Sequence, residues 1–98
     1  MLENLKYADF APHINTKFQL TELENIELEL IEVTEKNISP AQEMFSLTFC
    51  GSKDAFLQQS IYRMRHEVLG EGELFLVPIG VDADFYKYEA GFNRLIKS

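Results

Sequence analysis

The chain has little cysteine, few basic residues and no long apolar run, and each shortage excludes a class of protein. The single cysteine, Cys50, cannot close an internal disulfide. A disulfide-stapled secreted domain is therefore excluded, and a reducing cytoplasm is the expected location. No apolar stretch approaches the ~20 residues that span a bilayer. The N-terminus also lacks the basic start and apolar stretch of a signal peptide.

The charge balance argues against polyanionic partners. Nine basic residues against 16 acidic ones give a net charge of −7. Nucleic acids and anionic membranes bind basic surfaces, so we expect neither nucleic acid nor a membrane as partner. Apart from this acidity, which favours solubility, the composition is that of a globular protein, with 46% apolar and 26% charged residues. Residues 1–98 are expected to form a single β-barrel-like domain.

Apolar and polar residues alternate along most of the chain, as they do in half-buried β-strands. The expected strands are residues 17–21, 26–34, 44–50, 61–66, 73–79 and 85–94. Mixed helical spacings over residues 3–10 predict a short helix, ended by Pro12, that forms a lid over one open end of the core. The predicted fold is all-β, a small antiparallel β-barrel of about six strands with a short N-terminal helix.

The second expected strand changes phase at its centre. Its early apolar residues are even-numbered, up to Leu30, whereas Ile31 and Val33 are odd-numbered. A β-bulge near Leu30–Ile31 restores the phase and bends the strand. Glu27 and Glu29 share the other face, which we interpret as solvated because no histidine or aspartate joins them. The arginines at positions 63 and 65 are expected to lie across from these glutamates.

The stretch from Glu73 to Asn93 is the most apolar part of the chain and is interpreted as a β-hairpin. A glycine-flanked turn is expected at residues 69–72 and a second turn at residues 82–84. Residues 74–79 are apolar at both odd and even positions, which point to opposite faces of a strand. A core on one side of the strand can bury only one of these two sets. Either the N-terminal segment or another chain must cover the second parity. Pro78 predicts an edge, a bulge or a bend.

No segment carries a motif for catalysis, a cofactor or a metal, so none of these sites is predicted. The Asp82–Asp84 pair lacks the glycine and glutamate that complete a calcium loop, and neither histidine is near Cys50 in sequence. The candidates for a pocket or barrel rim are polar groups among aromatic residues: Tyr62, His66, Tyr86, Tyr88, Glu89 and Asn93. His66 is interpreted as a partly buried residue that fixes a backbone carbonyl at a strand end.

Four segments carry a resemblance to a known family. They are Phe45–Gly51 (FSLTFCG), Tyr62 with His66 and Gly70, Leu74–Gly80 (LFLVPIG) and Tyr88–Asn93 (YEAGFN). In these motifs the chain resembles a family of small bacterial all-β domains of unknown function, over residues 18–93. The resemblance implies a compact β-barrel-like domain with no known activity, sometimes encoded beside phage-tail-like genes. Cys50 and the segment Gln58–Ser60, where a glycine is usual, depart from the family pattern.

Three functions remain open at this point. The first is a non-enzymatic structural or protein-interaction module, part of a phage-tail-like or other larger assembly, or self-associating. The second is a small-ligand-binding barrel whose pocket is lined by Tyr62, Tyr86, Tyr88 and Phe92. The third, which we rank last, is an enzyme that uses His66 with Glu89.

Overall fold

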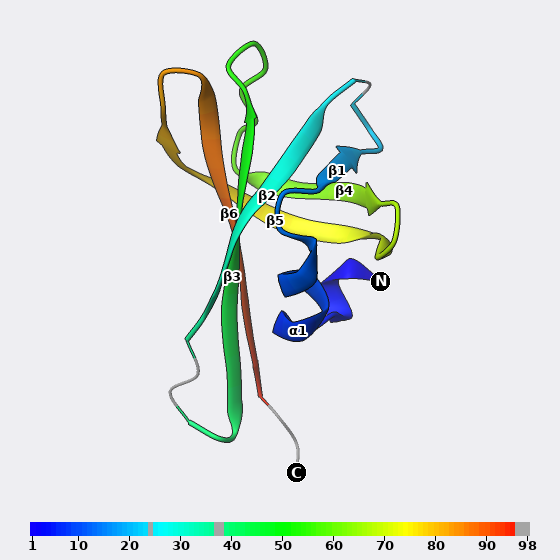
Figure 1. The fold of residues 1–98 in the computed structure, drawn as a ribbon, viewed down its shortest axis with the longest axis vertical. Helices are drawn as coiled ribbons and strands as arrows, with labels where there is room; N and C mark the ends of the chain where they lie inside the picture. The colour runs from blue at the N-terminus through cyan, green and yellow to red at the C-terminus, as the bar shows by residue number, and fades with distance from the viewer. Residues whose placement is uncertain (24, 37–38, 96–98) are drawn as a thin grey trace.

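The alternating segments close into a six-stranded antiparallel barrel, which confirms the predicted fold (Figure 1). The computed structural model describes residues 1–23, 25–36 and 39–95. The strands are β1 (Lys17–Leu20), β2 (Glu27–Glu35), β3 (Gln42–Ser52), β4 (Ser60–His66), β5 (Gly70–Val81) and β6 (Phe85–Leu95). Their order around the barrel is β1-β2-β3-β6-β5-β4, and β4 returns to β1.

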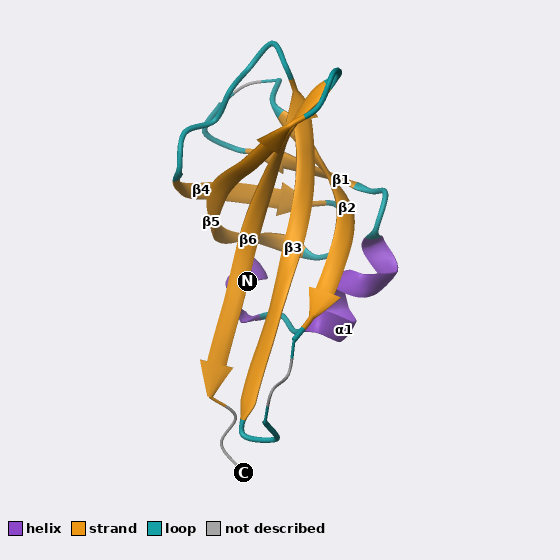
Figure 2. Ribbon diagram, turned by 90° about the vertical axis from the view of Figure 1, so that its left-hand side faces the viewer, coloured by secondary structure: helices purple, strands orange, loops and turns teal. Residues whose placement is uncertain are grey.

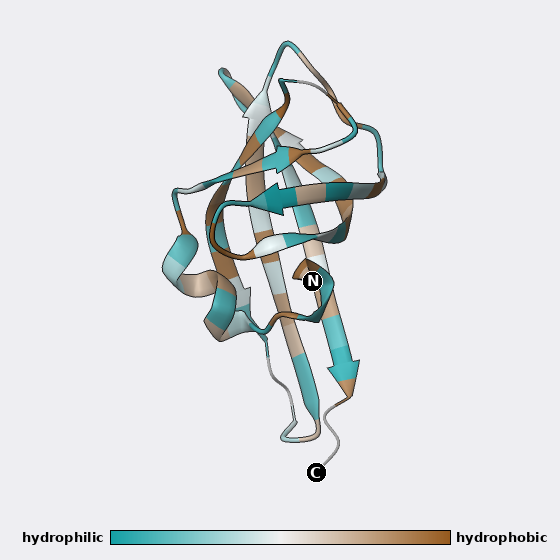
Figure 3. Ribbon diagram, turned by 90° about the vertical axis from the view of Figure 1, so that its right-hand side faces the viewer, coloured by the Kyte–Doolittle hydropathy of each residue, from teal (hydrophilic) through white to brown (hydrophobic). Residues whose placement is uncertain are grey.

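One parity of each strand fills the interior, as the alternation predicts. The fully buried residues include Phe18, Leu28, Leu30, Leu47, Phe49, Met64, Leu76 and Tyr88. Outside β5 and Ile61 of β4, polar residues take most positions of the opposite parity, and Figure 3 shows the resulting alternation of polar and apolar bands along the strands. Burial of these side chains is the main stabilising contribution to the barrel.

Two β-bulges set the curvature. In the β2–β3 pairing, Leu30 faces Phe49 and Glu32 faces Thr48, so Ile31 is the extra residue. This confirms the predicted bulge. In the β5–β6 pairing the register shifts between Pro78 and Gly80. Pro78 therefore lies at a bulge, where the missing N–H of proline is tolerated.

The strands β3 and β6 extend beyond the barrel. They pair from Gln42 with Leu95 to Ser52 with Phe85, and Figure 2 shows both running well past β4 and β5. The molecule is accordingly elongated, with extents of 44 × 25 × 23 Å. The extension exposes an inner apolar face that must be covered by another part of the chain.

The N-terminal segment covers this face. It consists of three short turns of helix: η1 (Leu2–Asn4), α1 (Tyr7–Phe10) and η2 (Ala11–His13). The Phe10 ring contacts Phe45 and Phe92, with ring centroids 6.0 and 5.6 Å apart. No helix in the described parts of the chain is long and apolar enough to cross a membrane.

The predicted helix boundaries need a correction. The helix does not run through residues 3–10, and Pro12 lies inside η2 rather than ending a helix. A helix this short has little stability of its own. Its boundaries are therefore set by its contacts with the sheet. Proline is accepted in η2 because a first-turn N–H has no partner within a helix.

Two further expectations were wrong. The glycine-flanked turn lies at residues 67–69, since β5 begins at Gly70, which has a φ of 92°. The arginines of β4 do not face β2, because β1 lies between those strands. Arg63 instead pairs with Glu71 of β5 at 3.2 Å.

Two expected loops fall partly outside the described residues. Position 24 lies between β1 and β2 in the sequence, and the neighbouring described residue Asn25 has a φ of 64°. Positions 37–38 belong to the loop between β2 and β3. The flanking strands end at Glu35 and begin at Gln42, slightly beyond the expected strand ends at residues 34 and 44.

The N-terminal segment is anchored where β5 and β6 separate, beyond their pairing of Val77 with Glu89. The Glu3 carboxylate accepts a hydrogen bond from the backbone N–H of Glu73 at 3.1 Å. Arg94 donates to the carbonyl oxygens of Glu3 and Leu5. Backbone N–H bonding holds the pKa of Glu3 below its ordinary value, against the opposing effect of burial.

Gly72 makes this anchoring possible, and its substitution tests the role of the segment. A Cβ at this position would collide with the backbone nitrogen of Leu2 and with the Glu3 carboxylate. We expect Gly72→Ala to lower the free energy of unfolding by about 1–3 kcal/mol, measured in urea, and to expose the N-terminal segment to proteases. Gly91→Ala is the matched control, because a Cβ there meets nothing within 4 Å. Equal stability of the two variants would contradict this account.

Candidate functional site

The six predicted rim residues do not form one site. The three tyrosines gather at the barrel end covered by residues 53–59. Tyr88 is fully buried, and its hydroxyl accepts a hydrogen bond from the Leu57 N–H at 3.0 Å. The Tyr62 hydroxyl donates to the Gln58 carbonyl at 2.6 Å, and the Tyr86 ring meets the Phe56 ring edge-on at 5.0 Å. The tyrosines thus hold the covering loop in place.

This arrangement bears on the ligand-binding hypothesis. Burial raises the pKa of Tyr88, and the neighbouring hydroxyls of Tyr62 and Tyr86 add to the increase. Leu57 is buried in the core, and its backbone N–H is bonded to the Tyr88 hydroxyl. Phe92, the fourth expected lining residue, stacks on Phe45 at 4.4 Å in the extended part of the sheet. The ligand-binding function stays a prediction.

His66 lies inside the barrel, only 4% exposed. Its Nδ1 accepts hydrogen bonds from the backbone N–H groups of Val68 and Leu69, at 3.0 and 3.1 Å. Nδ1 therefore carries no proton, and Nε2–H donates to Thr16 Oγ1 at 2.8 Å. The ring fixes backbone N–H groups of the turn, rather than the carbonyl that the sequence suggested. Burial lowers the pKa of His66, and His13 lowers it further against the opposing Glu67.

Glu89 and Asn93 lie on the outer face of β6, away from His66. They border a shallow depression of about 210 Å³ above Gly91. The Asn93 Oδ1 accepts a hydrogen bond from Gln42 Nε2 at 2.7 Å. The pairing of His66 with Glu89 that the enzymatic hypothesis requires is therefore not formed, since one side chain is inside the barrel and the other outside.

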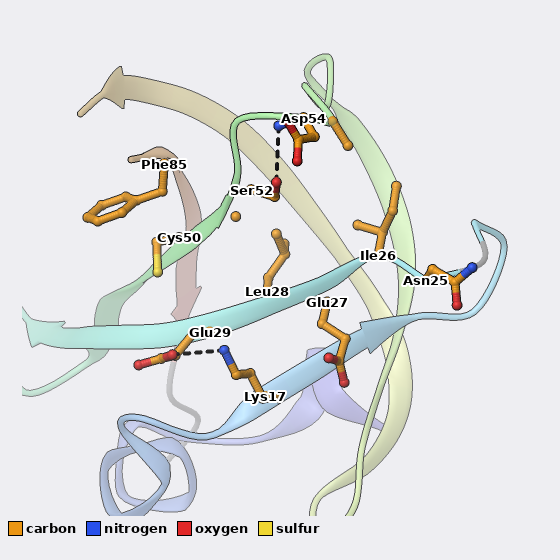
Figure 4. A pocket seen from close by; sticks show the side chains of 12 residues that line it. Lys17, Asn25, Ile26, Glu27, Leu28, Glu29, Cys50, Ser52, Asp54 and Phe85 are labelled. Carbon is orange, nitrogen blue, oxygen red and sulfur yellow. Dashed lines mark hydrogen bonds and ion pairs between the residues drawn. The ribbon is translucent and has the colours of Figure 1, made fainter. Parts of the chain in front are cut away.

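A larger groove lies where β2 and β3 separate, and no pattern in the sequence predicted it (Figure 4). The β2–β3 ladder ends at the pairing of Glu29 with Cys50. Beyond this point β2 follows β1 and β3 follows β6, which leaves a cleft of about 470 Å³. Its lining includes Lys17, Glu27, Leu28, Glu29, Cys50, Ser52, Asp54 and Phe85.

Two polar groups of this groove, Lys17 and Cys50, have raised pKa values. Lys17 Nζ pairs with Glu29 at 3.0 Å, and this contact raises the pKa of the lysine. Burial, reinforced by Glu29, raises the pKa of the Cys50 thiol, so the thiol remains protonated at neutral pH. Within residues 1–23, 25–36 and 39–95, no three His, Cys, Asp or Glu side chains are grouped to hold a metal ion.

The outer face of β4 and β5 carries the apolar residues of the second parity. Ile61 and Phe75 face each other across the two strands and are 61% and 48% exposed. Val77 is half-buried and Ile79 is 49% exposed. We call Ile61, Phe75, Val77 and Ile79 the β4–β5 strip. The N-terminal segment does not cover it, because Leu2 and Glu3 lie against Gly72 and Glu73 instead.

The fold and its surfaces define a small closed β-barrel domain with an N-terminal covering segment. The chain belongs to the family described as Domain of unknown function (DUF6916), which matches residues 5–92. This confirms the family type inferred from the sequence motifs and extends the match into the N-terminal segment. Comparison with curated proteins gave no match, and comparison with solved structures gave none either.

The buried His66 makes stability depend on pH. Above about pH 6.5 the imidazole is neutral in both states; below it, the unfolded chain binds a proton that the folded barrel resists. We therefore expect the free energy of unfolding to fall as the pH falls from about 8 to about 5. His66→Gln should flatten this dependence and cost about 1–3 kcal/mol at pH 8.

His13→Gln is the control for this experiment, because the His13 ring only packs against His66, with centroids 4.9 Å apart. It should retain most of the pH dependence, since burial is the larger cause of the lowered pKa of His66. Urea unfolding at a series of pH values gives both curves. Equal slopes for wild type and His66→Gln would show that another group is responsible.

Proposed function

We propose that this domain is a non-enzymatic protein-interaction module, and that the β4–β5 strip is its contact surface. The observation that carries the proposal is the exposure of Ile61 and Phe75 side by side on adjacent strands. Single exposed apolar residues are common on protein surfaces. A cross-strand pair continued by Val77 and Ile79 is a connected patch, and connected patches mark sites of protein contact.

The position of the strip supports a role in binding rather than in folding. The inward residues of β5, Leu74 and Leu76, are 3% and 0% exposed, so the core is complete without Phe75. Aromatic residues are enriched at the centres of protein interfaces, where a large ring is desolvated at small entropic cost. A module within a phage-tail-like or other larger assembly, as the family resemblance suggests, would use such a surface.

The test compares a strip variant with an exposed aromatic elsewhere. The double variant Ile61→Ser/Phe75→Ser removes the centre of the strip, and Phe56→Ser removes a ring that is 54% exposed at the barrel end. Each immobilised chain is exposed to a lysate of the source cells and to tagged wild-type chain. We expect the strip variant to lose partners that wild type and Phe56→Ser retain.

Folding must be controlled in the same experiment. The substitutions replace exposed residues that each contact a neighbouring side chain, so the free energy of unfolding should change by about 1 kcal/mol or less per site. Identical bound proteins for a folded strip variant and for wild type would refute the proposed contact surface.

A further inference from the structure

The two strands that carry the strip bear opposite charges. Along β4 the charged residues are two arginines, Arg63 and Arg65, with no carboxylate. Along β5 they are two glutamates, Glu71 and Glu73, with no basic residue. The facing pairs are Arg65 with Glu71, Arg63 with Glu73, and Ile61 with Phe75. Each of these outward-facing rows across the two strands is therefore either an Arg–Glu row or an apolar row.

We propose that the partner of the β4–β5 strip is a second copy of this chain, packed face to face about a two-fold axis parallel to the strands. The inference rests on the proposed function of the strip as a contact surface. Such an axis lays β4 of one copy over β5 of the other. Arg63 then meets Glu73 of the second copy, and Ile61 meets its Phe75. Both contacts occur twice, as they must in a two-fold interface.

The free carboxylate of Glu73 favours this arrangement. Arg63 pairs diagonally with Glu71 within the chain, and both side chains are partly exposed. Among the described residues, the Glu73 carboxylate has no hydrogen bond or ion pair, and only the Glu73 backbone N–H is bonded, to Glu3. The guanidinium of Arg63 from a second copy would supply the missing partner.

Other ways of pairing two copies are electrostatically unfavourable. A two-fold axis across the strands would lay β4 on β4 and bring arginine against arginine. The outer face of β2 carries Glu27, Glu29 and Glu32, of which Glu29 is paired with Lys17. Two such faces keep a net negative charge and repel. The β4–β5 face balances two arginines with two glutamates, although the whole chain has a charge of −7. At this face two acidic copies can meet without net repulsion.

The size of the face sets the expected strength. The seven paired positions of β4 and β5 present an area of about 24 × 10 Å, or ~240 Å². A standard interface buries about 800 Å² on each partner, so neighbouring residues must contribute as well. Aligned sheets pack within about 30° of each other, which brings in Val77 and Ile79 beside the central row. We expect a dimer that dissociates on dilution rather than an obligate one.

Charge reversal in trans tests the inference. In a homodimer of Arg63→Glu the introduced carboxylate would lie opposite Glu73, and in a homodimer of Glu73→Arg the introduced guanidinium would lie opposite Arg63. Each variant alone should therefore stay monomeric at concentrations where wild type dimerises. Mixed together, the two variants should form a heterodimer in which one pair of facing positions holds two native charges and the other holds two reversed charges. Every contact between positions 63 and 73 of the two copies then joins a guanidinium to a carboxylate. Light scattering from the micromolar to the millimolar range, with native mass spectrometry of the mixture, measures this.

The trans design separates dimerisation from folding, because effects of a charge reversal within one chain are the same in the mixture as alone. Thermal unfolding of each dilute variant verifies that it is folded. The inference is overturned if wild type remains monomeric over the whole range, if its dimer is unaffected by the reversals, or if the mixture fails to dimerise. If wild type is monomeric but binds a different protein through Phe75, the strip remains a contact surface and only the identification of the partner as a second copy is overturned. If wild type neither dimerises nor binds a different protein through Phe75, the proposed function is overturned too.

Discussion

The alternation of side chains along β5 is the constraint on which the structure depends. Because successive residues of a strand point to opposite faces, a segment that is apolar at both parities cannot be buried in a single core. In this barrel Leu74 and Leu76 take the interior. Phe75, Val77 and Ile79 remain on the outer face beside Ile61. The outer apolar patch and the proposed contact surface both follow from this division.

The same strand explains the N-terminal segment. Near the bulge at Pro78, β5 turns away from β6. Their pairing stops at Val77 and Glu89, and beyond these residues the two strands are separated by a gap. Leu2 and Glu3 enter this gap against Gly72, and Arg94 from β6 fastens them. The backbone N–H of Glu73 at this open edge is satisfied by the Glu3 carboxylate instead of by a further strand. The closed barrel and its covering segment are therefore one unit of packing.

The sequence predicts the strands and the β2 bulge well, since both depend on local alternation. It predicts much less about which polar groups come together. His66 and Glu89 both lie in the family motifs, yet one is inside the barrel and the other outside. The groove beside Cys50 arises where two ladders diverge, and no residue pattern marks such a divergence. The apolar run of β5 itself predicts the β4–β5 strip. Whether the strip is exposed to solvent depends on where the N-terminal segment packs, which the sequence does not reveal.

The central claim is that the second parity of β5 meets a second copy of the chain. Isotope-filtered NOE spectroscopy on an equal mixture of labelled and unlabelled protein tests it directly, because only contacts between copies give signals. The account predicts intermolecular signals between the Phe75 ring and the Ile61 methyl groups. Intermolecular signals confined to another surface, such as the groove beside Cys50, would contradict it, as would their absence at millimolar concentration.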